Sequence, residues 1–172
     1  MPKRWKSSGE YGLSDPKLRL EGSSMKSEIR FYRTGDAYGC FSNFSRHEIA
    51  LKGKKWPTCE HYFQAQKFAG TEHEEQIRQA KSPMSAAQMG RERSKPLRSD
   101  WESIKDKIMR EAVFAKFDQH PDLRETLLAT GNAALVEHTD KDSYWGNGGD
   151  GSGCNMLGII LMEVRAELRS EN

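Results

Sequence analysis

The sequence predicts a single, compact α+β domain that is mainly helical and contains a small antiparallel or mixed sheet. Its length of 172 residues suits one domain with a hydrophobic core of its own. Strand patterns are short and few, whereas helical signals dominate from residue 57 onward. Hydrophobic residues make up 35% of the chain and charged residues 30%, which is polar for a globular protein but well above the disordered class.

The chain begins with a segment rich in Lys, Arg, Ser, Gly and Pro that has no sustained periodicity. We therefore expect residues 1–26 to form a flexible basic arm and residues 27–172 to form the folded domain. Such an arm could touch a nucleic acid or a membrane surface, although most arms of this kind have no specific role.

The strands of the predicted sheet are short. Residues 28–33 alternate as a strand should. Residues 48–51 and 54–56 are separated by a Lys-Gly dipeptide, which predicts a hairpin that leads into the first helix. Residues 134–138 predict a returning strand.

The first helix, within residues 56–68, is the part of the sequence that most strongly suggests a binding site. Thr58 suits its N-cap, and Pro57 prevents its extension backwards. Its i, i+3, i+4, i+7 face consists of Glu60, Phe63, Gln64 and Lys67. Glu60 falls in the first turn, where the helix dipole favours a carboxylate, so we expect it to stay ionised. This polar face could bind a ligand, and an ordinary solvated face is the alternative.

Further helices follow. Ser82 and Pro83 suit the N-cap and first position of a helix that ends at Gly90. Residues 99–102 have the S-x-x-E pattern of a capping box and open a core helix. Another helix starts at Pro121. The last helix spans about residues 155–168. The core-facing positions of the last three helices are Trp101, Ile104, Ile108, Ala112, Ala115, Leu123, Leu127, Leu128, Leu157, Ile160, Leu161, Val164 and Leu168.

Two loops carry residues suited to a phosphorylated ligand. Residues 91–98 place four cations around a proline before a helix N-terminus, an arrangement that favours phosphate, with a solvated basic loop as the alternative. Residues 140–155 contain five glycines beside Tyr144 and Trp145. Glycines allow a backbone to approach a ligand closely, and Trp145 offers a flat surface for stacking. A flexible surface loop is the alternative, and the glycine spacing matches neither a P-loop nor a Rossmann motif.

Other classes of site find little support in the sequence. The three cysteines are odd in number and far apart, and the five histidines lack metal-binding spacing. We therefore expect a reducing, cytoplasmic location, no structural metal and no cofactor. No apolar run reaches membrane-spanning length and no h-region opens the chain, so we expect neither a membrane partner nor export. The net charge of +2 neither demands nor excludes an anionic partner.

Taken together, the motifs closely resemble the NADAR superfamily, especially its YbiA-like N-glycosidases, over about residues 29–168. The residues that carry the resemblance are Asn43 within Ser-Asn-Phe, the stretch 57–68, Gly90-Arg91, Trp101, Lys116-Phe117, Asp142-x-x-Trp145-Gly146 and Asn155-x-Leu157-Gly158. The resemblance implies a compact, mainly helical α+β fold and cleavage of a bond between ribose C1′ and a nitrogen. Family substrates are phosphoribosylamino-pyrimidine intermediates of riboflavin synthesis or ADP-ribose attached to guanine bases. The motifs do not separate these two groups.

The resemblance and the chemistry of the residues together suggest roles. Glu60 would stabilise oxocarbenium character at C1′. Lys67, the reactive lysine of the family pattern, would attack C1′ and hold the ring-opened sugar as a Schiff base. Alternatively, water would attack while Lys67 holds a hydroxyl or phosphate. The expected substrate-binding residues are Asn43, Tyr62, Gln64, Arg91, Lys95, Trp101, Asp142, Trp145, Gly146 and Asn155.

These expected contacts differ in kind. Asn43 and Asn155 would hydrogen-bond ribose or phosphate, Trp145 would stack, and Arg91 with Lys95 would meet phosphate. The predicted partner is a phosphorylated ribosyl or ADP-ribosyl small molecule, or an ADP-ribosylated nucleic acid. A non-catalytic ADP-ribose or NAD binding module is an alternative. A nucleic-acid-binding protein is another, which the near-neutral charge of the domain disfavours.

Overall fold

The computed structural model describes residues 27–171, so the basic arm expected at residues 1–26 lies outside the described residues. The described part of the chain confirms a mainly helical α+β domain. Its elements are β1 (Glu28–Phe31), the 3-10 turn η1 (Gly39–Phe41), β2 (Ile49–Leu51), β3 (Lys54–Trp56), α1 (Cys59–Gln66), α2 (Glu72–Arg78), α3 (Pro83–Gly90), α4 (Trp101–Gln119), α5 (Pro121–Ala129), β4 (Ala134–Glu137) and α6 (Met156–Ser170).

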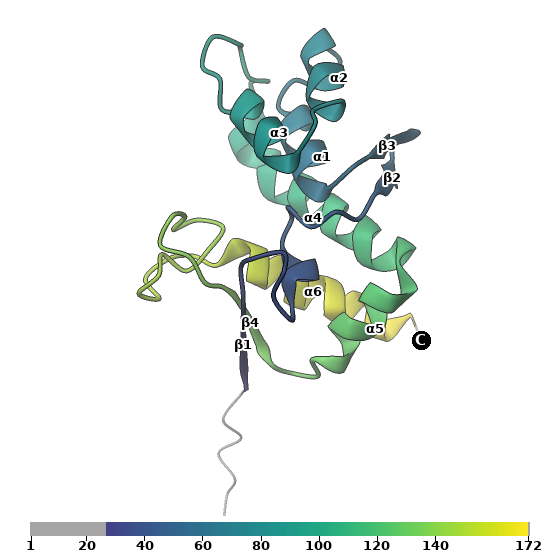
Figure 1. Ribbon diagram of the computed structural model, residues 1–172, viewed down its shortest axis with the longest axis vertical. Helices are drawn as coiled ribbons and strands as arrows, with labels where there is room; N and C mark the ends of the chain where they lie inside the picture. Colours follow the sequence, from purple (N-terminus) through teal and green to yellow (C-terminus); the bar gives the residue numbers. More distant parts are fainter. Residues whose placement is uncertain (1–26, 172) are drawn as a thin grey trace, which may run out of the picture.

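The described strands form two separate pairs rather than one sheet, and the pairs lie well apart (Figure 1). β1 pairs in parallel with β4, and this pairing places Phe31 opposite Glu137 at the end of both strands. β2 and β3 form the predicted antiparallel hairpin. Lys52 and Gly53 both adopt positive φ at its turn, as a tight hairpin requires. β1 is shorter than predicted, because pairing stops at Phe31 instead of continuing to Arg33.

The long helix α4 lies at the centre of the domain, where it contacts α1, α5, α6 and β2 (Figure 1). The core-facing positions predicted for α4, α5 and α6 are buried, apart from Ile104 and Leu128, which are partly buried. Removing such apolar side chains from water supplies most of the stabilisation of a domain of this size. The helical repeat in the sequence therefore predicted this core correctly.

The helix starts test the local sequence signals. Thr58 Oγ1 accepts a hydrogen bond from the His61 amide, and Ser82 Oγ accepts one from the Ser85 amide, which confirms both predicted N-caps. The prediction of a capping box at residues 99–102 is wrong. α4 begins after Asp100, which has non-extended φ and ψ of −93° and 8° and makes no side-chain cap.

Two further features of the helices bear on these predictions. The Asp100 carboxylate, instead of capping α4, accepts two hydrogen bonds from Arg98.

α2 was not predicted, because Ile77 is its only buried residue and so it shows no apolar repeat. Within residues 27–171, no helix is both long enough and apolar enough to cross a membrane.

Candidate active site

A cavity of about 820 Å³ lies between two groups of elements. One side is formed by α1 and the end of α3, and the other by the end of β4 and the glycine-rich loop that follows it. This volume suits a ligand of nucleotide size. The predicted site residues that line it are Asn43, Glu60, Gln64, Lys67, Arg91, Trp101, Asp142 and Trp145. The structure thus brings together residues that lie far apart in the sequence.

The polar face of α1 is directed into this cavity. All four residues of the predicted stripe, from Glu60 to Lys67, line it. Glu60 is only 3% exposed and Gln64 only 4%, so the stripe is not an ordinary solvated face. This burial favours the ligand-binding interpretation of the helix.

The Glu60 carboxylate is held by two side-chain amides. Asn43 Nδ2 donates to Oε2, and Gln64 Nε2 donates to Oε1 at 2.7 Å. Burial nevertheless raises the pKa of Glu60 to about 7, while Gln64, Lys67 and Arg91 oppose the rise. Burial therefore opposes the ionisation of Glu60 that the helix dipole favours, while the amide donor and the two cations support it. Loss of water around a fully buried carboxylate outweighs the dipole.

Asn43 is placed by a buried lysine. Lys116 of α4 is 0% exposed, and its Nζ donates to Cys40 O at 2.7 Å, Ser42 O at 3.0 Å and Ser45 Oγ at 3.1 Å. Burial lowers the pKa of Lys116. These bonds tie residues 40–45 to α4, so Lys116 fixes the loop that carries Asn43 to Glu60.

Lys67 follows the last turn of α1. Its Nζ donates to Gly90 O at 3.1 Å and lies 5.7 Å from the ring centre of Phe63 and 5.6 Å from that of Trp101. Burial lowers the pKa of Lys67, and the charge of Glu60 opposes this shift. A lysine in this setting gives up its proton more readily than one in water.

Gly90 allows α3 to touch α1 directly. A Cβ at Gly90 would clash with the side chain of Gln64, so a larger residue would push Gln64 out of place. Gln64 Oε1 is buried and has no hydrogen-bond donor within residues 27–171. An N–H or O–H group of a bound ligand would satisfy this acceptor.

The two loops are only partly directed at the cavity. Arg91 lines it, but Lys95 is exposed and does not, because residues 91–98 run outward over the surface. The Asp142 carboxylate accepts hydrogen bonds from the Tyr144 and Trp145 amides at 2.8 and 2.7 Å. These bonds hold Trp145 with its ring edge-on to Phe63, at 5.2 Å between ring centres.

Three further predicted contacts, those of Tyr62, Gly146 and Asn155, do not line the cavity. Tyr62 is fully buried and its hydroxyl donates to Glu111, because this face of α1 points into the core. Gly146 is buried where a Cβ would clash with Thr139.

The Asn155 amide serves the backbone instead of a ligand. It accepts from the Glu137 amide and donates to Leu135 O, both at 2.9 Å, and so joins β4 to α6. Asn155 also adopts the left-handed conformation, with φ of 53°, at the start of α6. The motif position of Asn155 therefore indicates a structural role in the loop.

Sequence reasoning missed Glu137, the last residue of β4, which lines the cavity and is 7% exposed. Burial raises its pKa to about 7, and the charges of Asp142 and Glu60 contribute to the rise. A carboxylate that ends an apolar strand directly before a glycine-rich loop was the available signal.

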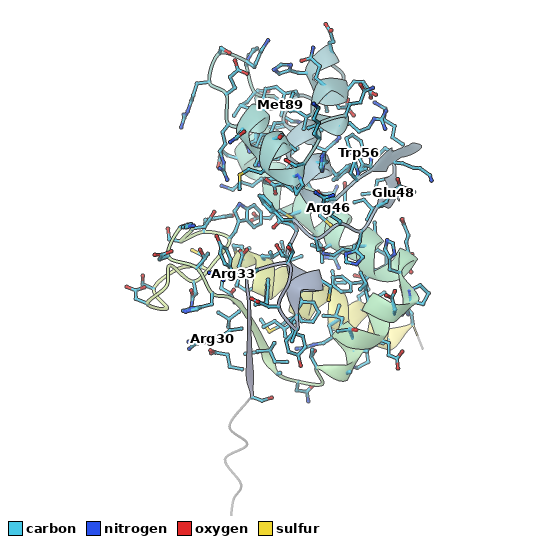
Figure 2. The ribbon with its side chains drawn as sticks, in the orientation of Figure 1. Arg30, Arg33, Arg46, Glu48, Trp56 and Met89 are labelled. Carbon is cyan, nitrogen blue, oxygen red and sulfur yellow. The ribbon has the colours of Figure 1, made fainter. Side chains whose placement is uncertain are left out.

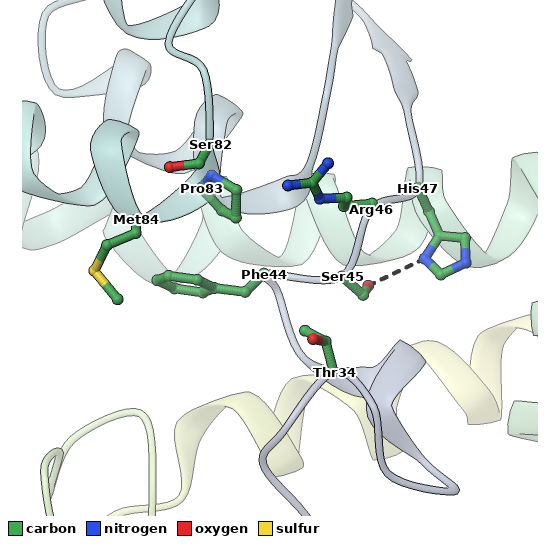
Figure 3. A pocket seen from close by; sticks show the side chains of 8 residues that line it. All are labelled: Thr34, Phe44, Ser45, Arg46, His47, Ser82, Pro83 and Met84. Carbon is green, nitrogen blue, oxygen red and sulfur yellow. Dashed lines mark hydrogen bonds between the residues drawn. The ribbon is translucent and has the colours of Figure 1, made fainter.

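A second, more open cavity of about 480 Å³ adjoins the first and shares Thr34, Phe44 and Met84 with it (Figure 3). Arg46 lines this second cavity, whereas Arg33 lines the first. Figure 2 labels both residues on the whole domain. The two cavities therefore lie side by side and are bounded in part by the same three residues.

The chain matches the family model of the NADAR domain over residues 30–169. It is 56% identical to N-glycosidase YbiA of Escherichia coli (strain K12) over 153 residues, which cover 89% of this chain and 96% of that protein. The NMR structure of the E. coli protein YbiA superposes with a TM-score of 0.80 and covers 89% of this chain and 91% of that one, at 56% identity.

Other relatives carry related names. N-glycosidase Npun_R5314 of Nostoc punctiforme is 48% identical, over 83% of this chain and 93% of that protein. The chloroplastic riboflavin biosynthesis protein PYRR of Zea mays is 43% identical, over 81% of this chain and 25% of that protein. On these matches, this chain belongs to the NADAR family.

Proposed function

We propose that the protein is an N-glycosidase, a hydrolase that cleaves the bond between C1′ of a phosphorylated ribose and the nitrogen of a base. One observation carries the proposal: the buried Glu60 carboxylate and the Lys67 amine project from one face of α1 into the same cavity. The names of the bacterial relatives support the same reaction class.

The carboxylate serves the sugar. Breaking the C1′–N bond builds positive charge on the ribose ring, and an ionised Glu60 beside C1′ stabilises that charge. The amide donors of Asn43 and Gln64 hold both carboxylate oxygens and favour the ionised form. Because these donors are already in place, the carboxylate needs little reorganisation during the reaction.

The amine serves as the nucleophile. Lys67 in its neutral form attacks C1′ as the base departs, and the ring-opened sugar then remains on Nζ as a Schiff base until water releases it. The lowered pKa of Lys67 supports this route, because a larger fraction of the amine is neutral at pH 7. Direct attack by water, with Lys67 holding a hydroxyl or phosphate, is the competing route.

The substrate belongs to one of two groups. A phosphoribosylamino-pyrimidine intermediate of riboflavin synthesis agrees with the name of the maize relative. ADP-ribose attached to guanine, free or in a nucleic acid, agrees with the adjoining second cavity, which offers room for a second nucleotide half. In both groups Arg91 meets a phosphate, and Trp145 together with Trp101 offers apolar surface to a base.

Product analysis distinguishes these substrates. The protein is incubated separately with a phosphoribosylamino-pyrimidine and with an ADP-ribosylated guanine nucleotide, and the products are identified by mass spectrometry. We expect the free base together with ribose 5-phosphate or ADP-ribose. If either compound binds but no product forms, the protein is a non-catalytic ADP-ribose or NAD binding module and not an enzyme.

A further inference from the structure

Two buried carboxyl groups from different elements line the cavity, and their surroundings differ. Glu60 of α1 receives one amide donor on each oxygen, and the charges of Lys67 and Arg91 favour its ionised form. The carboxyl group of Glu137 of β4 receives no hydrogen bond from the described part of the chain, where the only hydrogen bonds of Glu137 are made by its backbone. The charges that act most strongly on it are those of Asp142 and Glu60, both of which oppose its ionisation.

This difference decides where a single proton resides. Two neighbouring acids that repel each other do not both ionise readily near neutral pH. The amide donors and the cations stabilise the charge on Glu60, whereas no group within residues 27–171 donates a hydrogen bond to the Glu137 carboxyl, and the charges that act most on it are negative. The proton therefore resides on Glu137, and the pair consists of one carboxylate and one carboxylic acid with opposite functions.

The fold holds Glu137 firmly in this position. Its amide donates to Asn155 Oδ1 at 2.9 Å, and its carbonyl accepts from the Asn147 amide at 2.9 Å. Phe31 lies opposite it in the parallel pair of β1 and β4. The backbone is thus fixed on three sides while the carboxyl group is left for a ligand in the cavity.

We propose that Glu137 is the general acid of the site and protonates the nitrogen of the departing base. This assignment deepens the proposed N-glycosidase function and rests on it. The reaction needs a proton donor in addition to the Glu60 carboxylate, since the departing nitrogen gains negative charge as its bond to C1′ breaks. Glu137 supplies that donor.

Protonation of the leaving base is the same for either nucleophile. The electron pair of the C1′–N bond moves to the nitrogen, and the proton of Glu137 is transferred to that same nitrogen. The neutral base leaves, and Glu137 becomes a carboxylate. Lys67 Nζ or water forms the new bond to C1′ and transfers one proton through solvent to the Glu137 carboxylate, which restores the acid; on the lysine route, water then hydrolyses the Schiff base and releases the sugar.

A leaving-group comparison tests this role. The two probes are a phosphoribosylamino-pyrimidine, whose nitrogen needs a proton to leave, and p-nitrophenyl riboside 5-phosphate, whose phenolate leaves without one. Glu137→Gln keeps the shape of the side chain but cannot donate this proton. We expect its turnover to fall about 100-fold or more on the pyrimidine and less than about five-fold on the p-nitrophenyl compound.

Controls separate a chemical role from a structural one. Glu48→Gln removes an exposed carboxylate of the Glu48–Lys55 ion pair and should leave both rates unchanged. Equal losses on the two probes in Glu137→Gln would overturn the assignment of the acid while leaving the N-glycosidase function intact. If the wild-type protein cleaves neither probe nor an ADP-ribosylated guanine nucleotide, the proposed function fails and the assignment falls with it.

Discussion

Gln64 lies one helical turn after Glu60 on α1, and its amide nitrogen donates a hydrogen bond to the Glu60 carboxylate at 2.7 Å inside the cavity. The second carboxylate oxygen is held by Asn43, from a loop that is distant in the sequence. One amide donor from the same helix and one from a distant loop therefore hold the same carboxylate, that of Glu60. This arrangement makes Glu60 the first residue to test.

Replacing Glu60 by Gln should leave the fold intact and remove most of the turnover. The change keeps the size of the side chain, and either neighbouring amide can rotate to meet the new amide group. We expect a loss of at least about 100-fold, as for other groups that stabilise transition-state charge. Steady-state kinetics and a thermal melt check this prediction, and a collapse of the melting transition would indicate a structural role instead.

Lys67→Arg should abolish both turnover and covalent trapping. Arginine keeps the positive charge but is not a usable nucleophile at neutral pH. With wild-type protein, borohydride should reduce the Schiff base and add the mass of the reduced sugar to the peptide that contains Lys67. Near-normal turnover in the variant, with no adduct on the wild type, would instead make water the nucleophile.

Arg91→Ala should weaken binding of a phosphorylated riboside far more than binding of its dephosphorylated counterpart. The charge-assisted contact exists only where phosphate is present, so we expect a preferential loss of about ten-fold or more. Calorimetric titration of both ligands measures the difference. Lys95→Ala is the matched control, because Lys95 lies on the same loop but does not line the cavity. An equal effect of Arg91→Ala on both ligands would remove this residue from the phosphate site.

Gly90→Ala tests the contact between α3 and α1. Alanine stabilises a helix by about 1 kcal/mol relative to glycine, so a gain in stability is expected if nothing obstructs the new methyl group. Because that group would clash with Gln64, we expect a net loss of about 1–3 kcal/mol and reduced turnover. Adding Gln64→Ala should recover only part of the melting temperature, because the Cβ of residue 64 would still lie 2.8 Å from the new methyl group, and it should not restore the turnover. A stable and fully active Gly90→Ala protein would contradict the close approach of the two helices.

The stability of the protein should depend on pH through Glu137. Its pKa in the folded protein is about 7 against an ordinary value of 4.5, so protonation favours the folded state. This stabilisation is fully present below about pH 4.5 and is lost as pH rises through 7, at up to about 1.4 kcal/mol per pH unit. The charged groups that line the same cavity are Arg33, Glu60, Lys67, Arg91, Glu102, Lys105, Lys141 and Asp142.

Thermal melts from pH 5 to pH 8 measure this effect. Glu137→Gln cannot ionise, so its melting temperature should exceed that of the wild type at pH 8, and the advantage should shrink toward pH 5. A constant difference across this range would mean that Glu137 has an ordinary pKa in the folded protein.

Local signals predicted the fold well wherever short-range chemistry decides the outcome. The Thr58 and Ser82 caps and the core face of α6 follow from spacing alone, and the structure has all three. The Ser99 capping box failed because α4 begins one residue later than the pattern requires, after Asp100, whose carboxylate pairs with Arg98. α2 was not predicted because it buries too few apolar residues to give a helical repeat of apolar positions in the sequence.

The site was predicted less completely, because motif position does not show which way a side chain points. Tyr62 and Gln64 are two residues apart on α1, yet one faces the core and the other the cavity. Glu137 was missed because its environment is created by Glu60 and Asp142, which only the tertiary fold brings near it. The raised pKa of Glu60 was not predicted for a similar reason, since the sequence does not reveal full burial.

The buried Lys116 has a consequence for when the site is assembled. No carboxylate pairs with this ammonium group in the described part of the chain, and its three acceptors all lie in residues 40–45. Moving that loop away from α4 would leave the buried ammonium group without hydrogen-bond acceptors, at a cost of several kcal/mol. The wall of the cavity that carries Asn43 is therefore preorganised during folding and does not wait for the substrate to arrange it.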